Sequence, residues 1–411
     1  MTRFTPSTIG ELSEAVREAL GAGEPLELLC GGSKRGLGRP LQLPGTLDLS
    51  RLSGIRSYEP SELVLTAGAA TTLTEIEAAL AAKGQMLAFE PPDWSALYGL
   101  SGEEAGKASL GGALASNLSG PRRVKAGAAR DHFLGFRAVS GRGEMFKAGG
   151  KVVKNVTGYD LPKLMAGSFG TLAALEEVTV KVLPRPQSEE SVLLFPLEPA
   201  AAQSRLDRAL GSPLEVSAAA YLPAAAAAQI EAPKGLPAAV VLRLEGPSAS
   251  LRERRERLQK ELAEGCESSF LEGEESALLW RAIGDGAPFS KLLSSALWRL
   301  SAAPRRGAEI ALRLSRTLDL CWYLDWGGGL LWAAVKGAGE DGGARLLREA
   351  LHGEGGGESG SATLLRRSPG LSYALAPFEP QSEALSALSR RVKAAFDPCG
   401  ILNPGRMVEE S

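Results

Sequence analysis

The stretch Ser109–Gly120, Ser-Leu-Gly-Gly-Ala-Leu-Ala-Ser-Asn-Leu-Ser-Gly, constrains the fold of this chain more than any other part of it. Six of its twelve residues are Gly or Ser, and none of its side chains is charged. Because glycine has no Cβ atom, a flat ligand or a phosphate can approach its backbone and meet the amide N–H groups there. The same composition is also typical of a plain turn between two elements.

A second glycine-rich segment, Gly31–Gly38, favours the ligand-binding interpretation. It follows Pro25–Cys30, an apolar run that predicts a buried strand. Lys34 and Arg35 place positive charge where a pyrophosphate would sit, although a solvated loop tip would carry such residues too. The segment matches neither the Walker pattern Gly-x-x-x-x-Gly-Lys-[Ser/Thr] nor the Rossmann pattern Gly-x-Gly-x-x-Gly.

Length and composition exclude several classes of protein. The 411 residues predict two or three domains, and 46 basic against 48 acidic residues argue against a dedicated nucleic-acid binder. The four cysteines lie far apart, which argues against a zinc or iron–sulfur site and favours a reducing compartment. The chain begins without a signal-peptide core and has no apolar run of about 18 residues, so we expect a cytoplasmic protein without a membrane span.

Hydrophobic periodicity predicts an α+β chain with a change of character near residues 184–199. Helices are expected at 6–20, 72–83, 161–166, 200–210, 250–263 and 381–396, and a flexible loop at 353–361. Strands are expected at 25–30, 46–49, 63–68, 85–89, 133–139, 145–148, 175–183, 240–244, 319–326 and 330–336. We therefore expect a first domain at 1–186, a second α+β domain at 187–380 and a separate C-terminal segment at 381–411.

Six motifs in this order and spacing resemble the vanillyl-alcohol-oxidase, or PCMH-type, FAD-binding domain. They are Gly31–Gly38, Leu110–Gly120, Arg130–Gly135, Lys154–Leu161, Gly167–Leu172 and Phe396–Gly405. The resemblance covers about residues 1–186 and 381–408. Within the family, Phe89–Trp94, Ser33-Lys34 and Tyr323–Gly328 most resemble the FAD-binding subunits of bacterial glycolate oxidase complexes.

The resemblance implies a two-subdomain FAD-binding domain with a smaller α+β cap domain, and FAD held non-covalently in a groove. It implies that the C-terminal segment returns to the FAD domain. The first glycine-rich segment has no His for covalent attachment, and Cys30 directly before it is a remote candidate. The residues that it assigns to FAD binding are Gly31, Gly32, Ser33, Lys34, Arg35, Gly36, Pro92, Leu110, Gly111, Gly112, Asn117, Ser119, Gly120, Gly127, Arg130, Asp131, Gly135, Gly170, Thr171 and Asn403.

The chain differs from the family in the second domain, which contains the catalytic residues of related enzymes. Members that oxidise 2-hydroxy acids carry a histidine-rich box in the second domain, whereas this chain has only His132 and His352. We expect His132 to be packed near the nucleotide groove and His352 to be exposed. Adjacent residues supply no metal site. The catalytic base is not predicted, and Tyr159, Tyr323 and Arg406 remain candidates for a base or a carboxylate anchor.

The leading hypothesis is an FAD-binding subunit of a glycolate-oxidase-type complex that helps to oxidise a short 2-hydroxy acid or relays its electrons. Its expected partners are a larger flavin subunit and an iron–sulfur subunit, which would place it on the inner face of the membrane. The hairpin with Trp322, Trp326 and Trp332 is a contact surface or core. Two alternatives remain open: a stand-alone FAD-linked dehydrogenase, or a catalytically silent scaffold.

Overall fold

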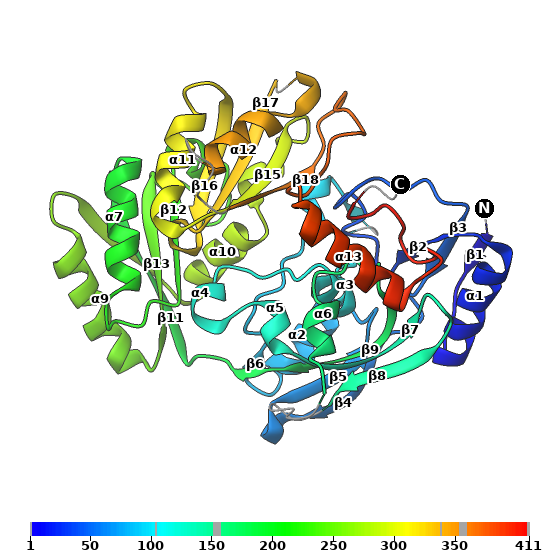
Figure 1. Ribbon diagram of the computed structural model, residues 1–411. Coiled ribbons are helices and arrows are strands. Elements are labelled where there is room, and N and C mark those ends of the chain that lie inside the picture. Colours follow the sequence, from blue (N-terminus) through cyan, green and yellow to red (C-terminus); the bar gives the residue numbers. More distant parts are fainter. Residues whose placement is uncertain (1, 103–104, 151–157, 338, 353–359, 409–411) are drawn as a thin grey trace.

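The computed structural model describes residues 2–102, 105–150, 158–337, 339–352 and 360–408 (Figure 1). Residues 154–157 of the motif Lys154–Leu161 lie outside these ranges, as do residues 353–359 of the expected flexible loop. No helix among the described residues is long and apolar enough to cross a membrane.

The N-terminal half contains two sheets and one short strand pair. A parallel sheet has the order β1–β3–β2, an antiparallel sheet has the order β4–β5–β9–β7–β8, and β6 pairs with β10. The strands are β1 (Thr2–Phe4), β2 (Leu26–Leu29), β3 (Gly45–Asp48), β4 (Ile55–Glu59), β5 (Val64–Gly68), β6 (Gln85–Met86), β7 (Phe133–Ser140), β8 (Met145–Gly149), β9 (Ala173–Lys181) and β10 (Leu183–Pro184). The helices are α1 (Ile9–Ala22), α2 (Leu73–Ala81), α3 (Leu110–Ala115), α4 (Arg123–Ala126), α5 (Ala129–His132) and α6 (Leu161–Met165).

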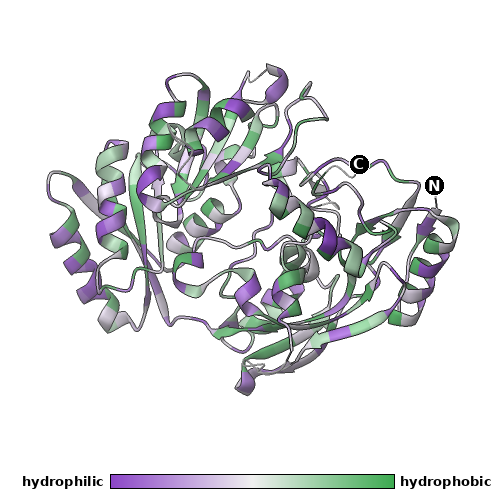
Figure 2. Ribbon diagram, in the orientation of Figure 1, coloured by the Kyte–Doolittle hydropathy of each residue, from purple (hydrophilic) through white to green (hydrophobic). Residues whose placement is uncertain are grey.

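Helix α1 shows how neighbouring residues determine where a helix begins and ends. The Thr8 side chain accepts a hydrogen bond from the Glu11 amide and caps the helix. At the other end Gly23 adopts a left-handed conformation with φ of 66°, which glycine adopts without steric cost. Leu12, Ala15, Val16 and Ala19 form one apolar stripe along the helix, and this stripe is buried. Figure 2 shows hydrophobic residues concentrated on the strands and hydrophilic ones on the outer helices.

The second half is one eight-stranded antiparallel sheet with the order β14–β11–β13–β12–β16–β17–β15–β18. Its strands are β11 (Ser188–Phe195), β12 (Ala218–Leu222), β13 (Ala239–Gly246), β14 (Glu267–Glu272), β15 (Ala296–Ser301), β16 (Asp319–Asp325), β17 (Leu330–Lys336) and β18 (Ser361–Arg366). Its helices are α7 (Pro199–Leu210), α8 (Ala224–Ala227), α9 (Ser248–Leu262), α10 (Gly273–Gly284), α11 (Gly307–Leu314) and α12 (Ala344–His352).

The two faces of this sheet pack against different parts of the molecule. Successive side chains of a strand point to opposite faces. Trp322 and Leu324 of β16 join a core with α7, α9, α11 and α12. Cys321 and Tyr323 join a second core that contains Leu97 of the N-terminal half. The inner face of the sheet is therefore the interface between the halves, and Trp322 and Trp332 are buried core residues rather than a contact surface.

The C-terminal segment crosses to the N-terminal half, where α13 (Glu383–Phe396) lies near α3 and α6 (Figure 1). Leu26 of β2 donates its amide to the Ile401 carbonyl at 2.8 Å, and the Asn403 amide donates to the Leu26 carbonyl at 3.0 Å. The buried Asp397 carboxylate accepts the amides of Ile401 and Leu402. The residues after α13 therefore extend the edge of β2.

Two expected segments take a different form, and the sequence did not predict the strands β4, β11, β12, β14, β15 and β18 or the helices α10, α11 and α12. The glycine-rich stretch Ser109–Gly120 contains the helix α3, because the Ser109 hydroxyl accepts the Gly112 amide and starts a helical turn. The strand expected at 85–89 is confined to Gln85–Met86, which pair with β10.

Candidate functional site

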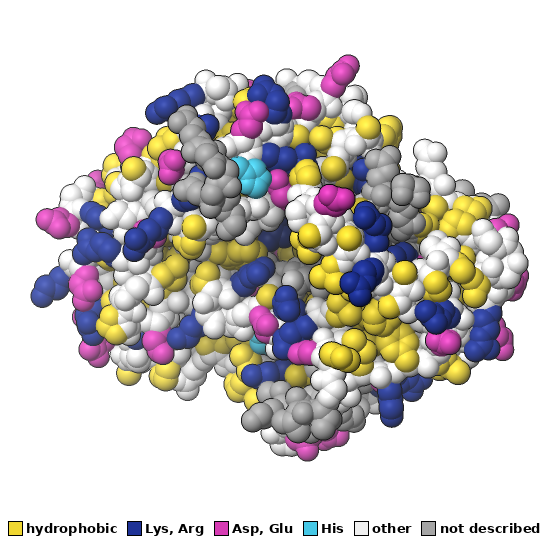
Figure 3. All heavy atoms as spheres, in the orientation of Figure 1, with side chains coloured by type: hydrophobic (Ala, Val, Ile, Leu, Met, Phe, Trp, Pro, Cys, Tyr) yellow, Lys and Arg dark blue, Asp and Glu magenta, His cyan; other side chains and the backbone are white. Residues whose placement is uncertain are grey.

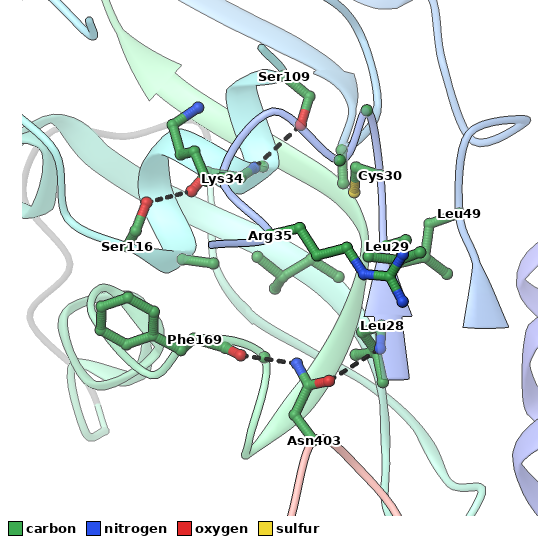
Figure 4. Close-up of a pocket in the computed structure, with 18 of the residues that line it drawn as sticks. Leu28, Leu29, Cys30, Lys34, Arg35, Leu49, Ser109, Ser116, Phe169 and Asn403 are labelled. Atoms are coloured by element: carbon green, nitrogen blue, oxygen red, sulfur yellow. Dashed lines mark hydrogen bonds between the residues drawn. The ribbon is translucent and has the colours of Figure 1, made fainter. Parts of the chain in front are cut away.

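A pocket with about 850 Å³ of empty space, partly open to solvent, lies where the two glycine-rich segments meet. Its walls are the end of β2 with the loop Gly31–Arg35, the start of α3, the loop Ser168–Gly170 and two residues of the C-terminal segment, Asn403 and Arg406 (Figure 4). Four segments that are distant in sequence therefore form one pocket.

The first loop offers unpaired hydrogen-bond donors to this pocket. Among the described residues, the amides of Gly31 to Lys34 have no hydrogen-bond acceptor. Lys34 is half-buried, and within the described ranges its ammonium group has only the Ser33 hydroxyl as a partner, at 3.5 Å. Burial lowers the pKa of Lys34 to about 8. A row of free amides beside an unpaired cation fits a phosphate group.

The neighbouring cations already have partners. The Arg35 guanidinium donates to both carboxylate oxygens of Glu27, at 2.9 and 2.5 Å. Arg406 donates to the carbonyl oxygens of Arg35 and Arg39 and so supports the loop from behind. Lys34 is therefore the better phosphate ligand of the predicted Lys34–Arg35 pair.

Close backbone contacts explain two glycines of the pocket. A Cβ atom on Gly31 would lie 1.8 Å from the Lys107 carbonyl oxygen, and one on Gly111 would lie 2.6 Å from the Ala69 carbonyl oxygen. The amides of Gly111 and Gly112 already bond to Ala69 and Ser109. They are therefore not the free donors that the sequence suggested, since Ser109 caps the helix.

Asn403 joins three segments at the pocket wall. Its side-chain oxygen accepts the Leu28 amide at 2.8 Å, and its side-chain nitrogen donates to the Phe169 carbonyl at 2.8 Å (Figure 4). Cys30 also lines the pocket, and burial raises the pKa of its thiol to about 11. The thiol is therefore protonated and a weak nucleophile.

The remaining predicted residues do not line the pocket. Asn117, Ser119 and Asp131 accept the amides of Arg130, Ala129 and Ala128, respectively. Those that lie outside the pocket wall are Gly36, Pro92, Leu110, Asn117, Ser119, Gly120, Gly127, Arg130, Asp131, Gly135 and Thr171. Pro92 lines a second cavity between the halves. The structure thus brings together Gly31, Gly32, Ser33, Lys34, Arg35, Gly111, Gly112, Gly170 and Asn403.

A buried ionic cluster, which the sequence did not suggest, lies beside Gly120. Glu90 accepts from Arg243 at 2.7 Å and from Arg122 at 3.0 Å, and Arg122 also pairs with Glu245 at 2.6 Å. Burial opposes ionisation, yet the two arginines lower the pKa of Glu90 and bring that of Glu245 to about 2. Glu90 and Arg122 come from the first half and Arg243 and Glu245 from the second, so the cluster joins the halves.

Strained backbone marks the same region. Asn117, Glu90, Phe169, Trp326 and Asn403 all have positive φ, between 45° and 54°. Non-glycine residues rarely adopt this conformation, and it is concentrated at functional sites. The Trp326 indole donates to the Gly120 carbonyl at 3.1 Å, which ties the second half to the second glycine-rich segment.

The candidate bases differ in position. Tyr159 is 90% exposed, and Arg406 supports the first loop. Tyr323 is buried on the inner sheet face, where its hydroxyl donates to the Ile283 carbonyl at 2.7 Å, and burial raises its pKa well above its usual value. Arg299 and Asp325 lie on that same face. Asp325 belongs to the motif Tyr323–Gly328, whereas no motif pointed to Arg299.

The two histidines take part in local packing. The His132 ring is buried, bonds to the Ala126 carbonyl at 2.9 Å and packs against Phe89. His352 is partly exposed and bonds to Glu379 at 2.9 Å. The prediction of a packed His132 is thus confirmed.

Comparison with known proteins identifies the class. The family model for the FAD binding domain matches residues 3–149, and the model for the C-terminal domain of FAD linked oxidases matches residues 379–407. The chain belongs to the PCMH-type family of FAD-binding oxidoreductases, and its cofactor is FAD. The predicted α+β fold with a PCMH-type domain is confirmed.

Individual members of the family are similar to this chain over most of its length. The chain is 36% identical to glycolate oxidase subunit GlcE of Escherichia coli over 97% of both chains. It is 25% identical to glycolate oxidase subunit GlcD of Bacillus subtilis over 92% of this chain and 81% of that protein. Its fold is similar to that of p-cresol methylhydroxylase, with a TM-score of 0.73 at 15% identity over 98% of this chain and 88% of that one.

Proposed function

We propose that this chain is the FAD-binding subunit of a glycolate-oxidase-type complex and takes part in oxidising glycolate or another short 2-hydroxy acid to the 2-oxo acid. The observation that carries this proposal is the similarity to GlcE along almost the full length of both chains. The pocket at the two glycine-rich segments supports it, since its residues fit a flavin nucleotide.

We assign the pyrophosphate of FAD to the free amides of Gly31–Lys34 and to the Lys34 ammonium. Gly111, Gly112 and Gly170 leave room along the remaining wall, and Asn403 holds that wall in place. Asn117, Ser119 and Asp131 act by holding the backbone of residues 128–130 in place. When bound, FAD supplies a hydride acceptor. We expect it to be held non-covalently, because the Cys30 thiol stays protonated.

We further propose that residues 1–186 with 381–411 act as the FAD-binding unit and residues 187–380 as the cap. Electrons leave the chain through partner subunits, a larger flavin subunit and an iron–sulfur subunit, so the isolated chain does not sustain turnover. In Figure 3 a depression runs between the halves with Lys and Arg side chains along it, which suits an acidic substrate. Attachment to the membrane face would come through the partners.

An anaerobic absorbance spectrum of the purified chain, recorded before and after excess glycolate and again after the partner subunits are added, tests this proposal. The proposal predicts a flavin spectrum that glycolate bleaches in the assembled complex. A flavin that stays oxidised in the complex with every short 2-hydroxy acid would contradict it. A chain that turns over alone with a dye would be a stand-alone dehydrogenase, and one that never binds FAD would be a scaffold.

A further inference from the structure

We propose that Arg299 and Asp325 form a substrate site on this chain, in which Arg299 binds the carboxylate of a short 2-hydroxy acid and Asp325 accepts the proton of its hydroxyl group. This inference rests on the proposed function. It supplies the catalytic base for which the sequence had no histidine.

Sheet register places both side chains on the inner face of the eight-stranded sheet. Tyr323 of β16 and Arg299 of β15 both lie opposite Trp332 of β17, and Tyr323 and Trp332 belong to the core shared with the N-terminal half. Asp325 is two residues beyond Tyr323 and therefore on the same face. The charged pair thus faces the half that contains the FAD pocket.

Arg299 is half-buried and has no carboxylate in ion-pair contact within the described part of the chain. Its guanidinium lies 5.6, 5.2 and 5.3 Å from the ring centroids of Trp94, Trp326 and Trp332. Among the described residues no carboxylate lies within 4.0 Å of it, and its buried Nε has no hydrogen-bond partner. Burial lowers its pKa to about 10, so it remains charged at neutral pH. A substrate carboxylate would complete a charge-assisted pair in this aromatic cage.

Asp325 has the properties of a general base. Only 2% of it is exposed, and its Oδ1 accepts the Trp326 amide at 2.7 Å, which fixes the side chain. Burial raises its pKa to about 7, close to a typical operating pH. The charged and titratable groups that face it are Glu90, which raises the pKa, Arg243 and Arg299, which lower it, and Tyr323.

Trp326 connects this pair to the cofactor region. Its backbone is strained at φ of 52°, and its indole bonds to the Gly120 carbonyl in the predicted FAD segment. Arg123 lies over the same indole at 4.4 Å from the ring centroid. Trp326 therefore connects Asp325, its neighbour in sequence, to Gly120 of the segment that is predicted to approach FAD.

The reaction balances with these groups. The O–H bond of the substrate breaks and its proton passes to the Asp325 carboxylate. The adjacent C–H bond breaks, its electron pair leaves with the hydrogen as a hydride, and the carbon–oxygen double bond forms. Bound FAD would supply the acceptor for that hydride. Arg299 holds the carboxylate, which fixes the orientation of the C–H bond.

The test uses FAD-loaded chain under anaerobic conditions, with oxalate as a non-reacting probe and glycolate as the substrate. Oxalate binding is read from the perturbation of the flavin spectrum, and reaction from the rate of bleaching after rapid mixing. Arg299→Met should weaken oxalate binding about 30-fold and Arg299→Lys should restore part of it. Asp325→Asn keeps the acceptor for the Trp326 amide, so it should bind oxalate within about threefold of wild type yet bleach at least about 100-fold more slowly.

A pH profile separates a base from a merely structural residue. The wild-type bleaching rate should rise with pH around 7 as Asp325 loses its proton, and this rise should be absent in Asp325→Asn. Two matched controls, Asp319→Asn at the exposed start of β16 and Arg305→Gln on the surface, should match wild type in every readout.

Two results would overturn the inference and leave the proposed function standing. One is normal oxalate binding by Arg299→Met together with normal bleaching of Asp325→Asn. The other is a wild-type flavin that glycolate bleaches only after the partner subunits are added. A flavin that glycolate does not bleach even in the complex would overturn both the inference and the proposed function.

Discussion

The pocket at the two glycine-rich segments and the ionic cluster between the halves are built in opposite ways. This cluster of Glu90, Arg122, Arg243 and Glu245 is called the charged layer below. The pocket presents unpaired backbone amides and the ammonium group of Lys34 from one short stretch of chain, Gly31–Lys34. The layer consists of side chains from separate elements that pair with one another, as Glu90 does with Arg243. A site made from backbone requires glycine and leaves a motif in the sequence, whereas a site made from distant side chains leaves none.

The largest effect is expected where glycine allows close backbone contact in the pocket. Gly31→Ala would place a Cβ atom 1.8 Å from the Lys107 carbonyl oxygen, so the loop must move, and we expect a loss of more than about 4 kcal/mol in unfolding free energy together with loss of FAD. Gly32→Ala is the matched control, because its Cβ meets nothing within 4 Å and only its φ of 74° opposes it. Gly32→Ala should lower the free energy of unfolding by about 1 kcal/mol, and urea unfolding measures this change. Equal effects of both substitutions would contradict this account of the loop.

In the charged layer, Glu90→Gln should lower the free energy of unfolding by about 3 kcal/mol, since it leaves the buried Arg243 and Arg122 without a full counter-charge. The control is Glu231→Gln, which removes a fully exposed partner of Lys291 and should leave the unfolding midpoint unchanged. Chemical unfolding of the three proteins at neutral pH measures the difference. A Glu90→Gln protein as stable as wild type would show that the cluster does not join the halves energetically.

The same layer predicts a pH dependence with a definite sign. The folded pKa of Glu245 is lowered to about 2 and that of Glu90 is also lowered, so their contribution is complete above the unfolded value of 4.5 and is lost as the pH falls toward 2. In Glu90→Gln the loss of stability between pH 5 and pH 3 should be smaller than in wild type. Unfolding curves at these two pH values measure it, and identical losses in both proteins would contradict the assignment.

A smaller effect of the opposite sign is expected at Asp285, between the halves. Burial raises its folded pKa to about 7 from 3.8, so the carboxylate destabilises the fold progressively as the pH rises from 3.8 to about 7, and this cost is complete above pH 7. Asp285→Asn keeps the acceptor for the Asp93 amide. It should raise the free energy of unfolding by about 2 kcal/mol at pH 8 and by less at pH 5. Thermal unfolding at both pH values checks this. A gain that does not change with pH would contradict it.

The sequence predicted those parts of the molecule that depend on local physics. The helix expected at 6–20 and the strands expected at 319–326 and 330–336 are present as α1, β16 and β17, because their patterns depend on neighbouring residues alone. Helix α3 was missed because two glycines outweighed the Ser109 cap in the local pattern.

Parts of the site could not be predicted from the sequence for a different reason. Arg299 and Asp325 reach the same sheet face only through the β16–β17–β15 register, in which β17 lies between their strands. Glu90 meets Arg243 across 153 positions of sequence. Ser119 and Asp131 carry motif positions, yet their side chains satisfy nearby amides. A motif therefore locates the segment that forms a site without stating which of its atoms face the ligand.

Titration of the apoprotein with FAD and with riboflavin, in wild type and Lys34→Met, tests most directly the claim that the first loop holds the FAD phosphates. Riboflavin has no phosphate, so Lys34→Met should weaken FAD binding about 20-fold and leave riboflavin binding unchanged. Arg35→Gln, which removes a cation already paired with Glu27, should change FAD binding less than about threefold. Unchanged FAD affinity in Lys34→Met, or an equal loss for both ligands, would contradict the claim.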